Sequence, residues 1–179
     1  TVTNSIFSGN TAYHGGAIFN NGNNLTITDS TISGNTANST GGAIYNSSSL
    51  TLSNSTISNN SAINGGGIRN NSNLTVSNST ISGNSAGQGG GIHNYLGTLT
   101  LTNSTLSNNS AVTSGGGILN QSTLSIANTI IANNIGDDYA GAGTSTVSPI
   151  SPATASCNLV TQSGLSAWAT TVTSAQLNL

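Results

Sequence analysis

The sequence predicts an all-β protein, a right-handed parallel β-helix of six to eight coils with about 24–25 residues and three short strands in each coil. Three observations support this fold class. One unit recurs along the chain with a fixed period, apolar residues alternate with polar ones inside the unit, and the apolar positions form columns when the units are aligned. A fixed period of this length is the signature of a solenoid, in which each unit buries its apolar face only against its neighbours.

The repeating unit is clearest in residues 25–49, LTITDSTISGNTANSTGGAIYNSSS. It returns from Leu50, Leu74 and Leu99, and in a decayed form from Leu124. The first twenty residues, TVTNSIFSGNTAYHGGAIFN, match the same unit without its leading Leu, so the chain opens inside one copy.

Three segments of the unit have the periodicity of strands. In residues 25–30, Leu25 and Ile27 alternate with threonines, which places one face inward and one outward. Residues 30–35 and 41–46 each carry one aliphatic residue among polar ones. Tight polar corners leave no room for a crossover helix, so each strand pairs in parallel with its counterpart one coil later, about 4.8 Å away. The hand preferred for such connections predicts right-handed winding.

The aligned units contain five apolar columns that no charged residue interrupts. Stacked in register, these columns predict a thin, continuous core along the axis. They are Leu25, Leu50, Leu74, Leu99 and Leu124; Val2, Ile27, Leu52, Val76, Leu101 and Ile126; Phe7, Ile32, Ile57, Ile81, Leu106 and Ile131; Ala12, Ala37, Ala62, Ala86 and Ala111; and Ile18, Ile44, Ile68, Ile92 and Ile118.

Three further columns consist of asparagine, interrupted once by Asp29. Asparagine tolerates left-handed backbone geometry, and amides stacked in register can form hydrogen-bonded ladders. Such structural ladders are favoured over glycosylation at sites such as Asn54, because glycans on every coil would crowd at the strand spacing. The predicted ladders are Asn4, Asn54, Asn78, Asn103 and Asn128 at the first corner; Asn10, Asn35, Asn60, Asn84, Asn109 and Asn134 at the second; and Asn20, Asn46, Asn70, Asn94 and Asn120 after the third strand.

Glycine pairs and triplets recur in phase before the third strand, where they predict a turn or a close backbone approach. A phosphate-binding loop would precede a helix and carry a lysine or the dinucleotide spacing. Neither feature occurs, so nucleotide binding is not expected.

Two motifs recur together in the coils and resemble those of a known family. FSGN at 7–10 with GGAI at 15–18 returns as ISGN at 32–35 with GGAI at 41–44, and later copies read GGGI. This pair resembles the F-x-x-N and G-G-A-[I/L/V] motifs of polymorphic outer membrane protein repeats, which occur in bacterial surface adhesins. The chain is more broadly similar to the pectate-lyase-like β-helix proteins of bacterial surfaces. The resemblance covers residues 1 to about 135 and implies a scaffold, which can serve many functions.

The composition excludes several classes of partner. Only 2% of the residues are charged, with one Lys or Arg in total, against about 25% in ordinary globular domains. Nucleic acid and anionic membranes are therefore not expected partners, because both require basic patches. No apolar run is long enough to insert into a membrane. The scarcity of Lys and Arg also removes trypsin sites, and the chain is expected to be secreted and extracellular or displayed on a cell surface.

Residues 136–179 break the pattern and predict one or two irregular C-terminal coils and a cap within the same domain as the regular coils 1–135. Trp168 is expected to cover the end of the core. Cys157 is the only cysteine, so neither a disulfide nor a metal pattern is predicted. Whether Asp137 and Asp138 bind calcium stays open.

One outward column mixes Phe19, Tyr45, Arg69, His93 and Leu119. Arg69 and His93 are expected to be neighbours on the outer surface, where the column forms either a solvated strand face or a surface that contacts sugars. No catalytic residue and no cofactor is predicted, because acid/base chemistry needs cooperating titratable groups within reach of each other. Outward threonines and serines also form a grid like that of ice-binding solenoids, although threonine simply suits exposed strands.

These observations predict a non-enzymatic structural protein whose copies stack head to tail into an extracellular filament or sheath. Stacking is expected because the first coil begins without a cap, and a head-to-tail contact continues indefinitely. The alternative is an adhesin-type module that binds glycans or host proteins through the Thr/Ser faces or the column of Arg69 and His93. An ice-binding protein and a polysaccharide lyase or hydrolase are less favoured.

Overall fold

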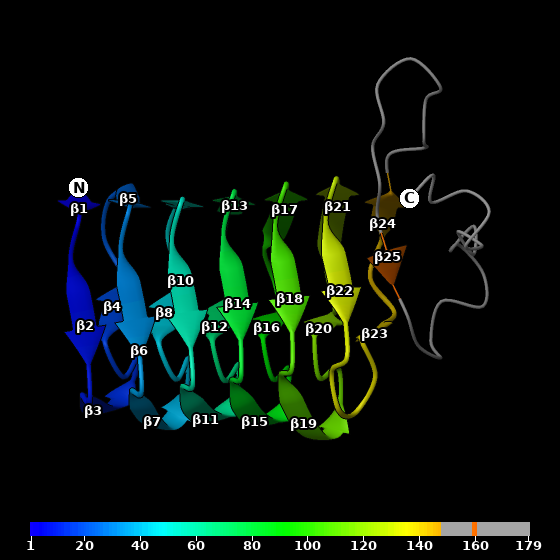
Figure 1. Cartoon of the computed structure of the whole chain (residues 1–179), viewed down its shortest axis with the longest axis horizontal. Helices are drawn as coiled ribbons and strands as arrows, with labels where there is room; N and C mark the ends of the chain where they lie inside the picture. Colours follow the sequence, from blue (N-terminus) through cyan, green and yellow to red (C-terminus); the bar gives the residue numbers. More distant parts are fainter. Residues whose placement is uncertain (148–158, 161–179) are drawn as a thin grey trace.

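The computed structural model describes residues 1–147 and 159–160, which form parallel β-sheets wound into a solenoid (Figure 1). The expectations for Cys157 and Trp168 concern positions outside the described residues. The described strands belong to four sheets, here called sheets I to IV. No helix long and apolar enough to cross a membrane occurs in this part of the chain.

The strands of each sheet come from successive coils. Sheet I contains β1 (Val2–Thr3), β5 (Leu25–Thr28), β9 (Leu50–Ser53), β13 (Leu74–Ser77), β17 (Thr98–Thr102), β21 (Thr123–Ala127) and β24 (Ser145–Val147). Sheet II contains β2 (Ile6–Ser8), β6 (Thr31–Ser33), β10 (Thr56–Ser58), β14 (Thr80–Ser82), β18 (Thr105–Ser107), β22 (Ile130–Ala132) and β25 (Leu159–Val160). Sheet III contains β3 (Thr11–His14), β7 (Thr36–Thr40), β11 (Ser61–Asn64), β15 (Ser85–Gln88) and β19 (Ser110–Ser114). Sheet IV contains β4 (Ile18–Asn20), β8 (Ile44–Asn46), β12 (Ile68–Asn70), β16 (Ile92–Asn94), β20 (Ile118–Asn120) and β23 (Tyr139–Gly141).

Each strand pairs in parallel with its counterpart one coil later, as predicted. Leu74, for example, lies between Leu50 and Leu99 in sheet I. Sheets I and II have seven strands each, which corresponds to about six turns of the solenoid. The predicted fold class and period are therefore confirmed.

Sheet III is a fourth strand per coil, where the sequence predicted three. Its inward positions are occupied by alanines such as Ala62 and Ala86, which lie opposite each other in the register. Polar residues flank them, so the segment lacks the aliphatic alternation that marks a strand. Neighbouring coils nevertheless hold it extended, because its backbone groups pair with the coils on both sides.

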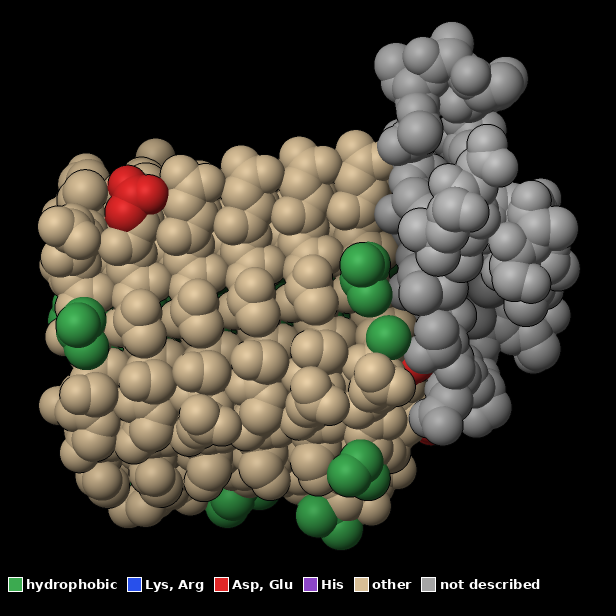
Figure 2. All heavy atoms as spheres, in the orientation of Figure 1, with side chains coloured by type: hydrophobic (Ala, Val, Ile, Leu, Met, Phe, Trp, Pro, Cys, Tyr) green, Lys and Arg blue, Asp and Glu red, His purple; other side chains and the backbone are tan. Residues whose placement is uncertain are grey.

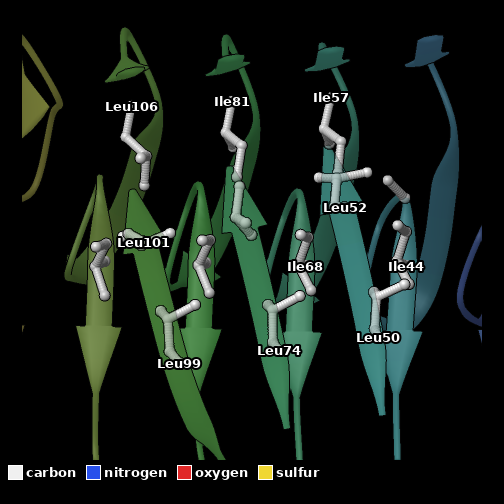
Figure 3. Packing of buried hydrophobic residues seen from close by; sticks show 14 of the residues in the cluster. Ile44, Leu50, Leu52, Ile57, Ile68, Leu74, Ile81, Leu99, Leu101 and Leu106 are labelled. Atoms are coloured by element: carbon white, nitrogen blue, oxygen red, sulfur yellow. The ribbon is translucent and has the colours of Figure 1, made fainter. Parts of the chain in front are cut away.

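The core is a column of aliphatic side chains enclosed by the four sheets. Figure 3 shows Leu50, Leu74 and Leu99 stacked along the axis, with Ile57 and Ile81 in a second row. These residues are buried in the same cluster. Each coil thus buries its apolar residues mainly against the equivalent residues of its neighbours.

The corner between sheets I and II depends on left-handed backbone geometry. Asn54 has φ 49° and Asp29 has φ 51°, and the other members of this column share the conformation. Asparagine and aspartate adopt it at lower cost than other non-glycine residues. The column thus supplies turn residues.

One glycine of each coil permits the close approach of neighbouring coils before sheet IV. A Cβ added to Gly66 would lie 2.5 Å from the carbonyl oxygens of both Gly90 and Ser85. Real Cβ atoms do not approach backbone this closely, which explains why glycine recurs at this position.

Beyond residue 135 the coils continue in altered form. β23 pairs with β20 in sheet IV, and β24 pairs with β21 in sheet I. Asp138 is fully buried at the start of this coil.

Candidate binding site

The outer side of sheet IV brings together side chains that are rare elsewhere in the chain. Its strands alternate inward Ile and Asn with one outward residue, and the outward residues pair in the order Phe19, Tyr45, Arg69, His93 and Leu119. Adjoining turns and the end of sheet III add further side chains. We call the whole group the aromatic strip, comprising Tyr13, His14, Phe19, Tyr45, Arg69, Asn71, His93, Tyr95, Leu119 and Gln121.

Aromatic rings dominate the first two coils of the strip. Phe19 and Tyr45 stack with ring centroids 5.1 Å apart and planes within 7° of parallel. His14 lies 5.3 Å from the Tyr45 ring and contacts the edge of Tyr13 in a T-shaped pair. Phe19 is 50% exposed and Tyr13 is 67% exposed, so this end presents apolar ring surface to solvent.

Arg69 lies at the centre of the strip and connects the two aromatic ends. Its guanidinium carbon is 4.1 Å from the centroid of Tyr95, a cation–π contact. Its Nε donates to Oδ1 of Asn71 at 3.1 Å, and Nδ2 of Asn71 donates to the hydroxyl of Tyr45 at 2.8 Å. The cation is therefore held in place by neutral groups.

His93 continues this chain of hydrogen bonds into the next coil. Nη1 of Arg69 lies 2.7 Å from Nδ1 and 3.3 Å from Nε2 of His93, and Nε2 of His93 lies 3.0 Å from Oε1 of Gln121. Arginine can only donate, so its position beside the ring favours an imidazole that keeps an unprotonated nitrogen. The cation beside the ring therefore favours the neutral imidazole.

Burial is the main reason why the pKa of His93 falls from its ordinary value of 6.5 to about 4. The hydrogen bond to Gln121 raises this pKa, and the charge of Arg69 lowers it. The side chain is only 2% exposed, so His93 is a covered part of the strip rather than a solvated surface residue. Burial also lowers the pKa of Arg69 from its ordinary value.

The second Asn column forms a hydrogen-bonded ladder along the wall. Each Oδ1 accepts from both the backbone N–H and the Nδ2 of the asparagine one coil earlier, at 2.9–3.1 Å. At the last rung the carboxylate of Asp138 takes the place of an amide oxygen and accepts both bonds from Asn134, at 2.9 and 2.8 Å. No group of three or more His, Cys, Asp or Glu side chains that could hold a metal occurs among the described residues.

The third Asn column forms another ladder, with Nδ2 to Oδ1 distances of 2.7–2.8 Å from Asn20 to Asn120. The first column does not form an amide ladder, because its side chains are exposed at the left-handed corner. Within the described coils, Nδ2 of Asn54 in this first column donates a hydrogen bond to Oδ1 of Asp29 at 3.2 Å.

A hydroxyl ladder that sequence reasoning missed follows that corner. The buried serines Ser30, Ser55, Ser79 and Ser104 each accept a backbone N–H from the preceding coil, at 3.1–3.2 Å. Each hydroxyl also donates to a carbonyl two residues earlier, at 2.7–2.8 Å. The signal was present, since serine recurs in phase immediately after the Asn column.

The hydroxyl columns of sheet I are also in register, with Thr75 between Thr51 and Thr100. Figure 2 shows one outer face of the solenoid, where uncharged polar side chains and backbone predominate, with scattered hydrophobic and acidic groups. This regular face contrasts with the cluster of rings and charge on sheet IV.

The fold and the strip together define a β-helix scaffold that carries one concentrated group of side chains on an outer face. The sequence matches the right-handed β-helix region family over residues 1–135. The chain therefore belongs to this family, and its coils wind right-handed. A search of the curated proteins and of the solved structures finds no match. The closer resemblance to polymorphic outer membrane protein repeats stays a prediction.

Proposed function

We propose that this β-helix is a non-enzymatic extracellular scaffold that binds a glycan along the aromatic strip. One observation carries the proposal: three of the four tyrosines, both histidines and the single arginine of the chain gather on this strip. In a chain with 4% aromatic and 2% charged residues, such a concentration on one face requires a local role.

The chemistry of the strip suits sugars. A sugar ring has apolar C–H faces, which pack on aromatic rings, and hydroxyls, which pair with amides and guanidinium groups. Phe19 and Tyr95 supply exposed ring surface, and Asn71 and Gln121 supply amides held in place by their own hydrogen bonds. Binding sites commonly combine aromatic lining with a few fixed polar groups in this way.

The dimensions favour a glycan over a protein partner. The column from Phe19 to Leu119 spans five coils, or about 20 Å at the strand spacing, with His93 and Leu119 themselves covered. The column is narrow, because each strand of sheet IV has only three residues. A stable protein interface buries about 800 Å² on each partner, more than a strip of this width offers. An extended oligosaccharide matches it, because the coil spacing is close to the length that one sugar adds.

The role as a binding module is favoured over catalysis by the composition of the strip. The right-handed β-helix family includes lyases and hydrolases as well as proteins without enzymatic activity. Glycoside cleavage by acid/base chemistry ordinarily uses a pair of carboxylates, and the aromatic strip contains none.

Replacing Tyr95 with alanine is expected to weaken glycan binding about tenfold, the effect of losing roughly 1.4 kcal/mol at a contact residue. Tyr95 is 41% exposed and covers Arg69, so both ring contact and the position of the cation are lost. Affinities would be measured by calorimetry with oligosaccharides that a glycan array identifies.

The matched control is Ile6→Ala on sheet II, which removes a 77% exposed side chain outside the strip. It should leave the affinity unchanged. The proposal is contradicted if no glycan on the array binds the protein at high concentration. It is also contradicted if the Tyr95→Ala variant and the parent bind with equal affinity. Capture of protein ligands alone would assign the strip to a protein partner.

We further propose that copies of the chain stack end to end. The columns keep one register through successive coils, and a head-to-tail contact between copies would continue this repeat along the axis. Electron microscopy should then show filaments with one axial repeat of about 30–40 Å, the height of six to eight coils. Short rods whose length does not change with concentration contradict stacking.

A further inference from the structure

We infer that the glycan carries one acidic sugar, placed over Arg69 between neutral sugars that contact the aromatic rings. This inference rests on the proposed function and specifies the chemistry of its ligand. It starts from Arg69, the single Lys or Arg of the chain.

Arg69 is a half-buried cation whose described partners are all neutral. They are the Asn71 amide, the His93 imidazole and the Tyr95 ring. A partly desolvated charge is costly unless an opposite charge or hydrogen bonds compensate for it. Nε and Nη1 make the hydrogen bonds seen within the described part of the chain, which leaves the donors of Nη2 for a ligand. A carboxylate is the acceptor that matches a guanidinium edge best.

The surrounding residues limit the ligand to one charge at this point. The other positions of the column are Phe19, Tyr45, His93 and Leu119, and the buried His93 beside the Arg69 cation is neutral. A glycan with a carboxylate on every sugar would place negative charges over these residues without a cation to pair with them. The formal net charge of −2 adds no attraction for a polyanion.

Two pairs of probes test the inference by calorimetry. Each pair contains an oligosaccharide with a single carboxylate and its neutral counterpart: xylotetraose with and without one glucuronic acid branch, and lactose with and without a terminal sialic acid. Tetragalacturonate provides the fully charged comparison. At least one singly acidic probe should bind about tenfold tighter than its neutral partner and tighter than tetragalacturonate, and added salt should reduce the preference.

The Arg69→Gln variant should bring the ratio of acidic to neutral affinity close to one. Arg69→Leu is a second variant expected to fold, since leucine already occupies this column at Leu119. Thermal unfolding verifies the fold of each variant, and Ile6→Ala should keep the parental ratio.

The outcomes separate the two proposals. Equal binding of acidic and neutral partners, or a preference for tetragalacturonate, overturns the single acidic sugar and leaves glycan binding standing. An unchanged ratio in both Arg69 variants also overturns it. If no probe binds and no glycan on the array binds, both the single acidic sugar and the proposed glycan-binding function are overturned.

Discussion

Replacing Asn60 with alanine is expected to destabilise the β-helix by about 3–5 kcal/mol, because several buried polar groups lose their partners. Oδ1 of Asn60 accepts from the backbone N–H and Nδ2 of Asn35, both at 2.9 Å. Its Nδ2 donates to Asn84 and to the carbonyl oxygens of Ile32 and Ser58. The residue is 1% exposed, so water cannot replace these bonds without opening the wall between two coils.

The neighbouring residue provides the control. Asn59 is exposed and has φ 56°, and glycine occupies the equivalent position at Gly34 and Gly83. Asn59→Gly should therefore change the free energy of unfolding by less than about 1 kcal/mol. Urea denaturation of both variants gives the comparison. Similar losses for Asn59→Gly and Asn60→Ala would show that the ladder contributes no particular stability.

The wall of the solenoid could be predicted from the sequence because parallel stacking converts a period into contacts. Residues one period apart are neighbours, so the Leu25 to Leu124 column and the Ile44 to Ile118 column follow from alignment of the units alone. Sheet III escaped detection because its inward side chains are alanines, whose strand conformation is imposed by the pairing of adjacent coils rather than by their own pattern.

The period does not reveal on which side of the wall a column lies. The columns of Asn54 and Ser55 recur with the same period, but Asn54 is exposed and Ser55 is buried. The left-handed backbone at Asn54 decides this by turning the chain at the corner. The two asparagine columns that form ladders differ from the first in this geometry, which the repeat alone does not encode.

The column of the candidate site was predicted from the sequence, whereas its flanking residues were missed although they also share one repeat position. Phe19, Tyr45, Arg69 and His93 share one register position. Tyr95 and Gln121 come from the turns that follow sheet IV, where the coils differ in length and sequence. Both residues directly follow the third Asn column, and their backbone N–H groups pair with the preceding coil. The period therefore places them beside the strip, and only their side-chain contacts with Arg69 and His93 lie beyond it.

Lowering the pH from about 6.5 to 4 is expected to remove up to about 3 kcal/mol of stability through His93, since each unit of pKa shift corresponds to about 1.36 kcal/mol. The pKa is 6.5 for the ordinary imidazole and about 4 in the folded protein. Between these values the unfolded chain binds a proton at His93 that the folded chain does not, so stability rises with pH in this window. Above pH 6.5 both states are neutral, and His93 adds no slope.

His93→Leu isolates the effect, because leucine occupies the next position of the same column at Leu119. The unfolding free energy of the parent, relative to that of the variant, should fall steadily as the pH is lowered from 6.5 to 4. Above pH 6.5 the difference between the two proteins should stay constant. NMR titration of the imidazole measures the folded pKa directly. Parallel stability curves across this range, or a midpoint near 6.5, contradict the burial of a neutral His93.

Protonation of His93 also has a local consequence that follows from donor and acceptor roles. Nη1 of Arg69 lies beside both ring nitrogens, and a protonated ring, which can only donate, would set two donors and two positive charges against each other. The pair must then separate, and Arg69 loses one of the contacts that fix it over Tyr95. A strip that binds sugars through this arrangement should therefore lose affinity near pH 4 together with stability, and the His93→Leu variant should show a flatter pH dependence of binding.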